Sequence, residues 1–355
     1  RISSQMELQR TILDWYLDNK RDLPWRNTND PYKIWISEII LQQTQVSYGI
    51  NYYNTFIKQF PTIHDLAKAD QQTILNIWQG LGYYNRAINL HYTAKYVSRE
   101  LEGKFPRKFD ELIKLKGIGD YTASAISSIC FNEKESVVDG NVYRVLSRYF
   151  GIKNPINLST TFKVFKKKAN ELIRNVKSCG DYNQALMEFG ALQCRPKPEC
   201  SKCVLSNQCY AFQHNFVHDL PVKLKKKKHK TRYFNFIVPV NKENKTKILQ
   251  RDSSDIWNKL YQFPLIESKK NVVKFSNSLL TDQLDQCLKL NQKSIEKINR
   301  TNIMHKLSHQ TLYLSFWKLD INSPIINGIK INDIAKYPFP VPIKNFINDF
   351  INVGN

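Results

Sequence analysis

Apolar residues along the first two thirds of the chain recur with the spacing of helices. Leu8, Ile12, Trp15 and Tyr16 would share one helix face, and similar three- and four-residue intervals continue to about residue 212. Proline and glycine turn signals divide this pattern into segments of helical length. The pattern predicts an all-α first domain.

The pattern changes in the last third of the chain. Residues 233–238 (YFNFIV) and 311–317 (TLYLSFW) are β-branched and aromatic runs of strand length. Residues 276–290 lie between these runs and have helical spacing. We therefore expect a small α+β domain over residues 233–355.

A basic stretch separates the two patterns. Residues 223–232 (KLKKKKHKTR) contain seven Lys or Arg and no acidic residue, so they cannot pack into a core. We interpret residues 213–232 as a linker. Its charge either lies along phosphates or is simply solvated.

Composition makes a polyanion the first candidate partner. The 355 residues include 53 Lys and Arg against 31 Asp and Glu, for a net charge of +22. Such a field attracts nucleic acid, although a lysine-rich proteome would account for the charge equally well. No apolar run approaches the ~20 residues that span a bilayer, and the N-terminus lacks the apolar block of a signal peptide. We expect a cytoplasmic protein without membrane contact.

Four of the seven cysteines fall within sixteen residues, in the spacing Cys-x5-Cys-x2-Cys-x5-Cys. They are Cys194, Cys200, Cys203 and Cys209. Four thiolates at this density predict a metal site, either tetrahedral zinc or a [4Fe–4S] cluster, and the spacing alone does not choose between them. The three scattered cysteines are expected to be structural, because the chain lacks the secretory signal that accompanies disulfide frameworks.

A glycine-rich turn precedes a helical segment at Lys116-Gly117-Ile118-Gly119. Glycine allows positive φ and close backbone approach, so we expect Gly117 and Gly119 to expose amide N–H groups to a phosphate. An ordinary turn between two helices has the same local signature.

Two carboxylates stand out from their surroundings. Glu38 interrupts an apolar helical run, where desolvation would raise its pKa and make it a general acid near neutrality. Taken alone, such a glutamate is more often a solvated helix residue. Asp139 stands where a helix N-cap is expected, and capping is the simplest interpretation of it.

The motifs LPWR, WxSEIxLQQTQV, WQGLGYYxRAxxL, KGxGDYTASAI, VDGNVxRVLSR and MEFGA occur in this order before the four cysteines. Together they resemble the MutY-type adenine DNA glycosylases of the helix-hairpin-helix, iron–sulfur superfamily. The resemblance is dense over residues 6–212 and covers the rest in outline. It implies a multidomain protein. An all-α helix-hairpin-helix glycosylase domain at 1–212, with its cluster loop at 194–209, would precede the basic linker at 213–232 and a C-terminal α+β Nudix-like domain at 233–355.

The resemblance also implies an activity, which is excision of adenine mispaired with 8-oxoguanine, or with guanine, by hydrolysis of the N-glycosidic bond. Glu38 would protonate the flipped adenine, and Asp139 would stabilise or capture the positively charged sugar that remains. Tyr121 and Asn141 would position Asp139 and the sugar. The residues implied to contact DNA in this domain are Leu41, Gln42, Gln43, Tyr83, Lys116, Gly117 and Gly119.

Two positions depart from the family pattern. The first cysteine interval is five residues where the family usually has six, so the ligand geometry is open although we still expect a [4Fe–4S] cluster. Lys116 stands where the broader superfamily often has proline, and it should add a phosphate contact.

The family's C-terminal domain reads 8-oxoguanine. Residues 233–355 lack the clustered glutamates of a Nudix hydrolase, so we expect this domain to bind and not to hydrolyse. Its candidate contacts are Ser308 and His309, whose side chains can donate and accept hydrogen bonds. A polar turn before a strand is the alternative, and Leu307 replaces the aromatic residue that the family has before this pair.

Two other functions compete with this one. A bifunctional glycosylase and lyase of the endonuclease III type needs a lysine just after the hairpin to form a Schiff base, and this chain has Tyr121 there. A non-catalytic mismatch-binding protein would not need both Glu38 and Asp139. We expect a monofunctional, monomeric glycosylase associated with the bacterial nucleoid, with double-stranded DNA that contains 8-oxoguanine:A or G:A mispairs as its partner.

Overall fold

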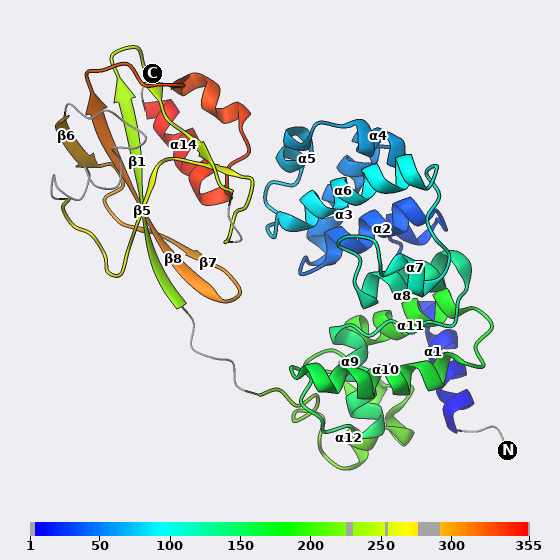
Figure 1. Cartoon of the computed structure of the whole chain (residues 1–355). Helices are drawn as coiled ribbons and strands as arrows, with labels where there is room; N and C mark the ends of the chain where they lie inside the picture. The colour runs from blue at the N-terminus through cyan, green and yellow to red at the C-terminus, as the bar shows by residue number, and fades with distance from the viewer. Residues whose placement is uncertain (1–3, 225–229, 253–254, 276–291, 354–355) are drawn as a thin grey trace. The chain divides into compact units, whose positions relative to one another are not determined.

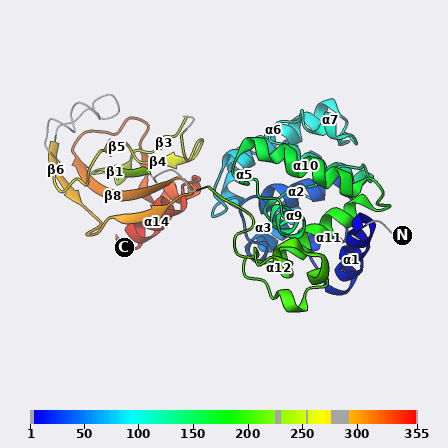
Figure 2. The same ribbon diagram turned by 90° about the horizontal axis from the view of Figure 1, so that it is seen from below.

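The computed structural model describes residues 4–224, 230–252, 255–275 and 292–353 (Figures 1 and 2). The helix predicted at residues 276–290 and part of the basic stretch lie outside the described residues. The chain forms two compact units, the first from residues 1–69 and 89–226 and the second from residues 70–88 and 227–355. Residues 70–88 thus group with the C-terminal segment, and the domain limits proposed from the sequence remain a proposal.

Every regular element described between residues 4 and 224 is helical, which confirms the predicted all-α class of this part. The α-helices are α1 (Ser4–Asn19), α2 (Pro31–Leu41), α3 (Val46–Gln59), α4 (Ile63–Lys68), α5 (Gln71–Ile77), α6 (Asn85–Glu100), α7 (Phe109–Leu112), α8 (Asp120–Phe131), α9 (Gly140–Phe150), α10 (Ser159–Ile173), α11 (Cys179–Leu192) and α12 (Tyr210–Gln213). Short 3₁₀ turns are η1 (Pro24–Arg26), η2 (Cys200–Lys202) and η3 (Ser206–Gln208). None of the described helices is long and apolar enough to cross a membrane.

The core of the first unit joins the start of the chain to its later helices. Figures 1 and 2 show α1 beside α11, and the two helices pack against each other. Ile12 of α1, Leu146 of α9, Phe165 of α10 and Leu186 of α11 are all fully or almost fully buried in one cluster. Burial of such side chains contributes roughly 1.5–3 kcal/mol each, so this cluster fixes α9 and α11 relative to each other.

Two glycines let α11 approach its neighbours closely. A Cβ added at Gly180 would lie 2.7 Å from the Ile129 Cα atom of α8, and one added at Gly190 would lie 2.6 Å from the Asn141 Cβ atom of α9. Real Cβ atoms do not tolerate such distances, so α8 and α9 can pack this closely against α11 only at glycine. The helix that carries Tyr121 and the helix that Asp139 caps therefore both pack closely against α11.

The second unit contains a mixed sheet, as the strand-length runs predicted. The strand order is β5-β1-β8-β6, with β7 also paired to β8. The long strands β1 (Lys230–Asn241) and β8 (Gln310–Ile321) are parallel, and the other pairs are antiparallel. The remaining elements are β2 (Lys245–Thr246), β3 (Leu249–Gln250), β4 (Tyr261–Gln262), β5 (Leu265–Ser268), β6 (Gln292–Lys297), β7 (Ile303–Lys306), β9 (Ile329–Lys330), η4 (Ile331–Lys336) and α14 (Val341–Val353).

Aromatic packing attaches α14 to this sheet. The rings of Phe316 in β8 and Phe346 in α14 are stacked with centroids 3.7 Å apart, and the ring of Phe236 in β1 also stacks on Phe316, with centroids 5.3 Å apart. All three side chains are buried. A helix on one face of a sheet is the α+β arrangement that the sequence predicted.

Candidate functional site

Glu38 is a buried carboxylate on an apolar helix. It lies in α2, where its neighbours Ile36, Ile39 and Ile40 are also buried, and its own exposed fraction is 7%. Its Oε2 atom has no hydrogen-bond partner among the described residues. Burial raises the pKa of Glu38 to about 7, a hydrogen bond from Tyr121 opposes the rise, and the charge of Asp139 adds to it. The group is poised to hold a proton near neutral pH.

Tyr121 interacts with both predicted catalytic carboxylates. It is in the first turn of α8, its hydroxyl group hydrogen-bonds Glu38, and it lies 3.6 Å from the Met187 Sδ atom of α11. Burial and the negative charges of Glu38 and Asp139 raise the pKa of Tyr121 well above its ordinary value. The phenol therefore stays a neutral hydrogen-bond donor across the physiological pH range.

Asp139 has a different environment from Glu38. It is the N-cap of α9, as the sequence predicted, and its Oδ1 accepts a 2.7 Å hydrogen bond from the Val142 N–H. Its Oδ2 accepts a 2.8 Å bond from Asn141 Nδ2. Burial raises the pKa of Asp139, whereas these hydrogen bonds and the charge of Arg144 act to lower it. Donors aimed at both oxygens of Asp139 favour its ionised form. Glu38 does not have donors to both of its oxygens.

A chain of hydrogen bonds connects Asp139 to the cysteine loop. Asn141 donates to Asp139 and accepts a 2.8 Å bond from Arg144 Nη2. Arg144 donates from Nε to the Cys194 carbonyl oxygen at 2.6 Å and from Nη2 to the Gly190 carbonyl oxygen at 2.7 Å. One arginine thus connects the backbone of the first predicted metal ligand to the asparagine that holds the predicted catalytic aspartate.

The four clustered cysteines line one small hollow. Cys194, Cys200, Cys203 and Cys209 all face it, and Arg148 Nη1 lies 3.5 Å from the Cys194 sulfur. Over the described ranges, no three His, Cys, Asp or Glu side chains already stand in metal-binding geometry. The donor set is nevertheless four soft sulfur ligands with a cationic hydrogen-bond donor beside them, and this chemistry fits a thiolate-bound cluster.

The two hairpin glycines differ in conformation, and only the first uses the positive φ that glycine allows. Gly117 has a φ of +80°, and a Cβ there would lie 2.8 Å from Asn89 Cβ. Gly119 instead has an extended backbone (φ −94°, ψ −177°), because it is the N-cap of α8. A Cβ at Gly119 would meet nothing within 4 Å, so this backbone is open to an approaching group. Lys116 is exposed beside it.

Two predicted DNA contacts have strained backbones. Gln43 and Tyr83 are non-glycine residues with φ of 56° and 48°, a conformation that costs such residues of order 1–3 kcal/mol. Both side chains are exposed, 47% in the case of Tyr83. Two further predicted DNA contacts lie at the C-terminal end of α2. They are Leu41 and Gln42, both partly buried, and Gln42 Nε2 lies 3.4 Å from Thr122 Oγ1. Strain held at exposed side chains is typical of functional positions.

Ser308 and His309 occupy the tight turn between β7 and β8. The turn is closed by a 2.8 Å bond from the Leu307 N–H to the Gln310 carbonyl oxygen, and both predicted side chains are exposed. Within the second unit, the hydroxyl groups of Ser308 and Tyr83 are hydrogen-bonded to each other. The structure therefore brings together two residues that the sequence analysis assigned separately to DNA.

A buried ion cluster was missed in the sequence analysis. Glu188 of α11 has an exposed fraction of 1% and accepts hydrogen bonds from Arg21 and Arg26, the shortest at 2.6 Å and 2.7 Å. Burial alone would raise the pKa of Glu188, but these donors hold it at about 2. The signal was a glutamate within the apolar MEFGAL segment, which needs a buried cationic partner.

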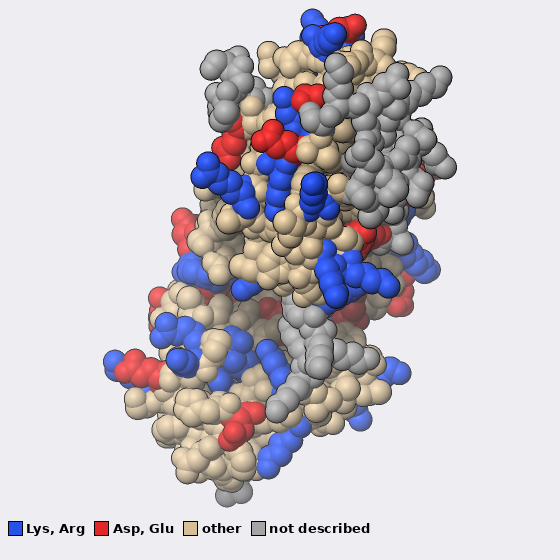
Figure 3. Space-filling view, turned by 90° about the vertical axis from the view of Figure 1, so that its left-hand side faces the viewer, with Lys and Arg blue, Asp and Glu red and all other residues tan. Residues whose placement is uncertain are grey.

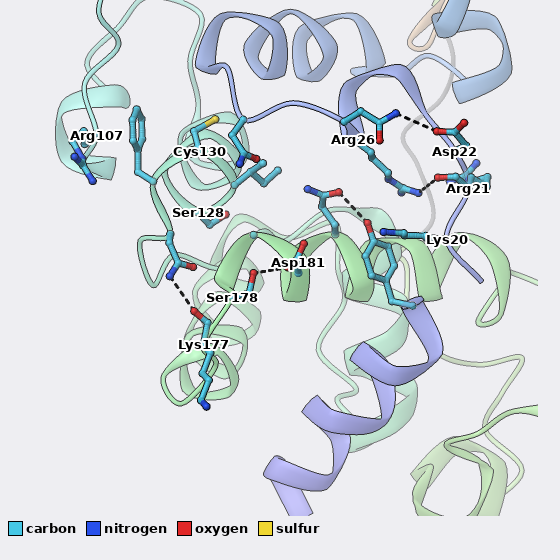
Figure 4. Close-up of a pocket in the computed structure, with 18 residues that line it drawn as sticks. Lys20, Arg21, Asp22, Arg26, Arg107, Ser128, Cys130, Lys177, Ser178 and Asp181 are labelled. Carbon is cyan, nitrogen blue, oxygen red and sulfur yellow. Dashed lines mark hydrogen bonds between the residues drawn. The ribbon is translucent and has the colours of Figure 1, made fainter. Parts of the chain in front are cut away.

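The same arginines line a basic cavity of about 670 Å³. Figure 4 shows Lys20, Arg21 and Arg26 on one side of it and Arg107 and Lys177 on the other. Lys and Arg side chains are also spread, among fewer Asp and Glu, over the face drawn in Figure 3. The excess of positive charge is therefore a property of the folded surface.

Comparisons with known proteins show what the chain resembles. Residues 36–174 match the HhH-GPD superfamily of base excision DNA repair proteins, and residues 235–349 match the NUDIX domain. An adenine DNA glycosylase from Buchnera aphidicola subsp. Baizongia pistaciae is 40% identical over 312 residues, which is 86% of this chain and 84% of that protein.

Two solved structures share the fold. A thermostable thymine-DNA glycosylase has a TM-score of 0.54 and 34% identity, covering 59% of this chain and 96% of its own. A complex of endonuclease III with DNA has a TM-score of 0.51 and 21% identity, covering 60% of this chain and 98% of its own.

The burial of Glu38 predicts an effect on stability. Because its pKa is raised from 4.5 to about 7, the folded state loses stability as pH rises through this interval. Glu38→Gln removes the ionisation. We measure the free energy of unfolding of variant and parent in urea. The value for Glu38→Gln minus the value for the parent should rise by roughly 2–3 kcal/mol between pH 5 and pH 8. The exposed control Glu100→Gln should show no such trend, and a pH-independent difference for Glu38→Gln would contradict the assignment.

Proposed function

The chain belongs to the adenine DNA glycosylase family, and on that basis we propose that it excises adenine paired with 8-oxoguanine or with guanine in duplex DNA. It is a DNA N-glycosylase of base excision repair. The observation that carries the proposal is a pair of carboxylates that differ in their hydrogen-bond donors. Glu38 is buried with one oxygen left without a donor, whereas Asp139 accepts a hydrogen bond on each oxygen.

Glu38 acts as the general acid in this proposal. Adenine is a poor leaving group until a ring nitrogen is protonated, and a carboxyl group with a pKa of about 7 is still protonated in a large part of the molecules at neutral pH. The base must leave the helix stack to reach a buried acid, which costs a few kcal/mol. As the bond from adenine to the sugar breaks, the electron pair leaves with the protonated base.

Asp139 receives the positive charge that develops on the sugar. Its ionised carboxylate either stabilises this cation electrostatically or captures it as a covalent acetal, and water then adds to complete hydrolysis. Asn141 donates a 2.8 Å hydrogen bond to this carboxylate, and Tyr121 hydrogen-bonds Glu38. Two carboxyl groups with different proton affinities thus divide the work of acid and nucleophile.

Strand cleavage by a lysine is not part of the proposal. Tyr121 stands where the lyase needs its amine, and the nearby Lys166 is engaged in other contacts. Its Nζ donates to Asp120 at 3.0 Å and to the Ser136 carbonyl oxygen at 2.7 Å. A lysine amine held by these contacts is not free to attack the sugar. We therefore propose a monofunctional enzyme that acts as a monomer in the bacterial nucleoid.

We further propose that Cys194, Cys200, Cys203 and Cys209 hold a [4Fe–4S] cluster. When bound, such a cluster can exchange one electron and ties the segments that carry its ligands to one another. Arg144 and Arg148 would link it to α9, because they already donate to the carbonyl oxygens of Cys194 and Arg195.

The C-terminal turn is proposed to read the base opposite adenine. Ser308 and His309 are exposed at the tip of the β7–β8 hairpin, where both can donate and accept hydrogen bonds to a purine edge. In the helical half, the hairpin at Lys116, Gly117 and Gly119 is proposed to hold backbone phosphate.

The activity is tested with a duplex that contains one adenine opposite 8-oxoguanine. We expect strand cleavage only after hot alkali, because a monofunctional glycosylase leaves an abasic site. Glu38→Gln and Asp139→Asn should each lower single-turnover excision by at least about a hundredfold while duplex affinity stays close to that of the parent. The exposed variant Glu100→Gln serves as the control. Parental rates for Glu38→Gln would refute the general-acid role, and cleavage without alkali would indicate a lyase.

The metal assignment is tested by elemental analysis of protein purified without oxygen. We expect about four irons per chain and a broad absorption band at the edge of the visible range, as for a thiolate-bound [4Fe–4S] cluster. One equivalent of zinc without iron would show that the cysteines form a zinc site.

The lesion-reading turn is tested by competition between 8-oxoguanine:A and G:A duplexes in one tube. We expect replacement of Ser308 and His309 together by alanine to reduce the preference for 8-oxoguanine:A severalfold without abolishing excision, because the catalytic carboxylates are on other elements. The neighbouring exposed variant Lys306→Ala is a control for loss of charge and contact nearby. An unchanged preference ratio in the double variant would exclude this role.

A further inference from the structure

A second groove lies beside the hairpin, outside the residues assigned above apart from Lys116. It has a volume of about 740 Å³ and is formed by α6, the loop after it, and the segment from α7 to the hairpin (α6 and α7 are labelled in Figures 1 and 2). Leu101, Phe105 and Leu115 form its apolar part, and Phe105 and Leu115 are buried.

Two tyrosines project from one face of α6 into this groove. Tyr92 and Tyr96 are one helical turn apart, so they lie on the same face. Their exposed fractions are 56% and 44%, large values for aromatic side chains. Exposed aromatic surface rimmed by polar groups is typical of a binding site.

The rim of the groove is basic. Lys104, Lys114 and Lys116 line it against a single acid, Glu111, and all four are exposed. The Lys116 ammonium lies 4.5 Å from the centroid of the Tyr92 ring, a cation–π distance. The charge therefore suits an anionic ligand that also offers flat apolar surface.

The groove and the hairpin are built on the same helix. Thr93 of α6 donates a 2.6 Å hydrogen bond to the Lys116 carbonyl oxygen, and Asn89 of α6 contacts Gly117 so closely that a Cβ there would clash. The next positions on this helix, Tyr92 and Tyr96, form the groove. A strand whose phosphate is held at the hairpin could therefore continue along these two rings.

We propose that this groove binds single-stranded DNA, extending the hairpin contact of the proposed function to unpaired nucleotides next to the duplex. In a duplex the faces of the bases are covered by stacking, so a tyrosine ring can stack only on an unpaired or terminal base. Aromatic platforms beside lysines are how proteins bind single strands without reading their sequence. A groove of about 740 Å³ has room for one or two nucleotides of a single strand.

Fluorescence anisotropy with a labelled 12-nucleotide oligothymidylate tests this proposal, because that probe contains no adenine to excise. Stacking contributes roughly 1–3 kcal/mol per base, so we expect Tyr96→Ala to weaken its binding at least about fivefold. Tyr96→Phe keeps the ring and should retain parental affinity. Tyr48→Ala, which removes a tyrosine of 50% exposure from α3, is the matched control and should also bind like the parent.

The lysines are tested through the salt dependence of the same binding. Replacing Lys104 and Lys114 together by alanine should reduce the slope of log affinity against log salt by about 1.4, because each phosphate contact of a single strand contributes about 0.7. A variant with both Lys33 and Lys58 replaced, which lie outside the groove, should keep the parental slope.

The outcomes separate this proposal from the proposed glycosylase function. Weaker oligothymidylate binding by Tyr96→Ala, with unchanged excision from a blunt duplex, supports the groove. Parental binding by Tyr96→Ala, or an equal loss in Tyr48→Ala, overturns it and leaves the groove to a protein partner or to no ligand. An equal loss of duplex and single-strand affinity also overturns it. If no duplex is ever cleaved, the glycosylase proposal fails while the oligothymidylate result still stands.

Discussion

Desolvation of one carboxyl group is the constraint on which the rest of this site depends. Glu38 lies among isoleucine side chains on α2, and burial moves its pKa to about 7. In water the same group would be ionised at neutral pH and could not donate a proton. A buried charge without partners is costly, so the protein must keep Glu38 away from solvent without offering it strong donors. The surrounding helices satisfy that condition.

Asp139 shows how hydrogen-bond donors oppose the same effect at a neighbouring carboxylate, whose pKa burial also raises. The N-terminus of α9 supplies the Val142 N–H, and Asn141 covers the second oxygen. These donors act against the burial that raises its pKa, so the two groups differ in environment although Tyr121 contacts one and feels the charge of both. The N-terminus of α9 therefore favours the ionised form of the residue that caps it, and the capping role of Asp139 is compatible with the catalytic role proposed for it.

Sequence patterns predicted features that depend on local chemistry. Glu38 in an apolar helix and Asp139 as an N-cap can both be predicted from a few neighbouring residues. The all-α class of the first part of the chain follows from its repeated helical spacing. Features that depend on distant pairing were missed. Arg26 and Glu188 are 162 positions apart, so nothing local indicated their contact. Gly117 and Gly119 look alike in sequence, yet only the first has positive φ, because packing against α6 and the start of α8 decides each conformation.

The central claim is that burial keeps a large part of the Glu38 population protonated at neutral pH, and the carboxyl carbon itself reports this most directly. In protein labelled with ¹³C at the glutamate side-chain carboxyl, the Glu38 signal is identified by its loss in Glu38→Gln and followed as pH changes. The account predicts a titration midpoint near 7, far from the ordinary glutamate value of 4.5. A Glu38 midpoint close to 4.5 would contradict it, because the carboxyl group would then be ionised when adenine has to be protonated.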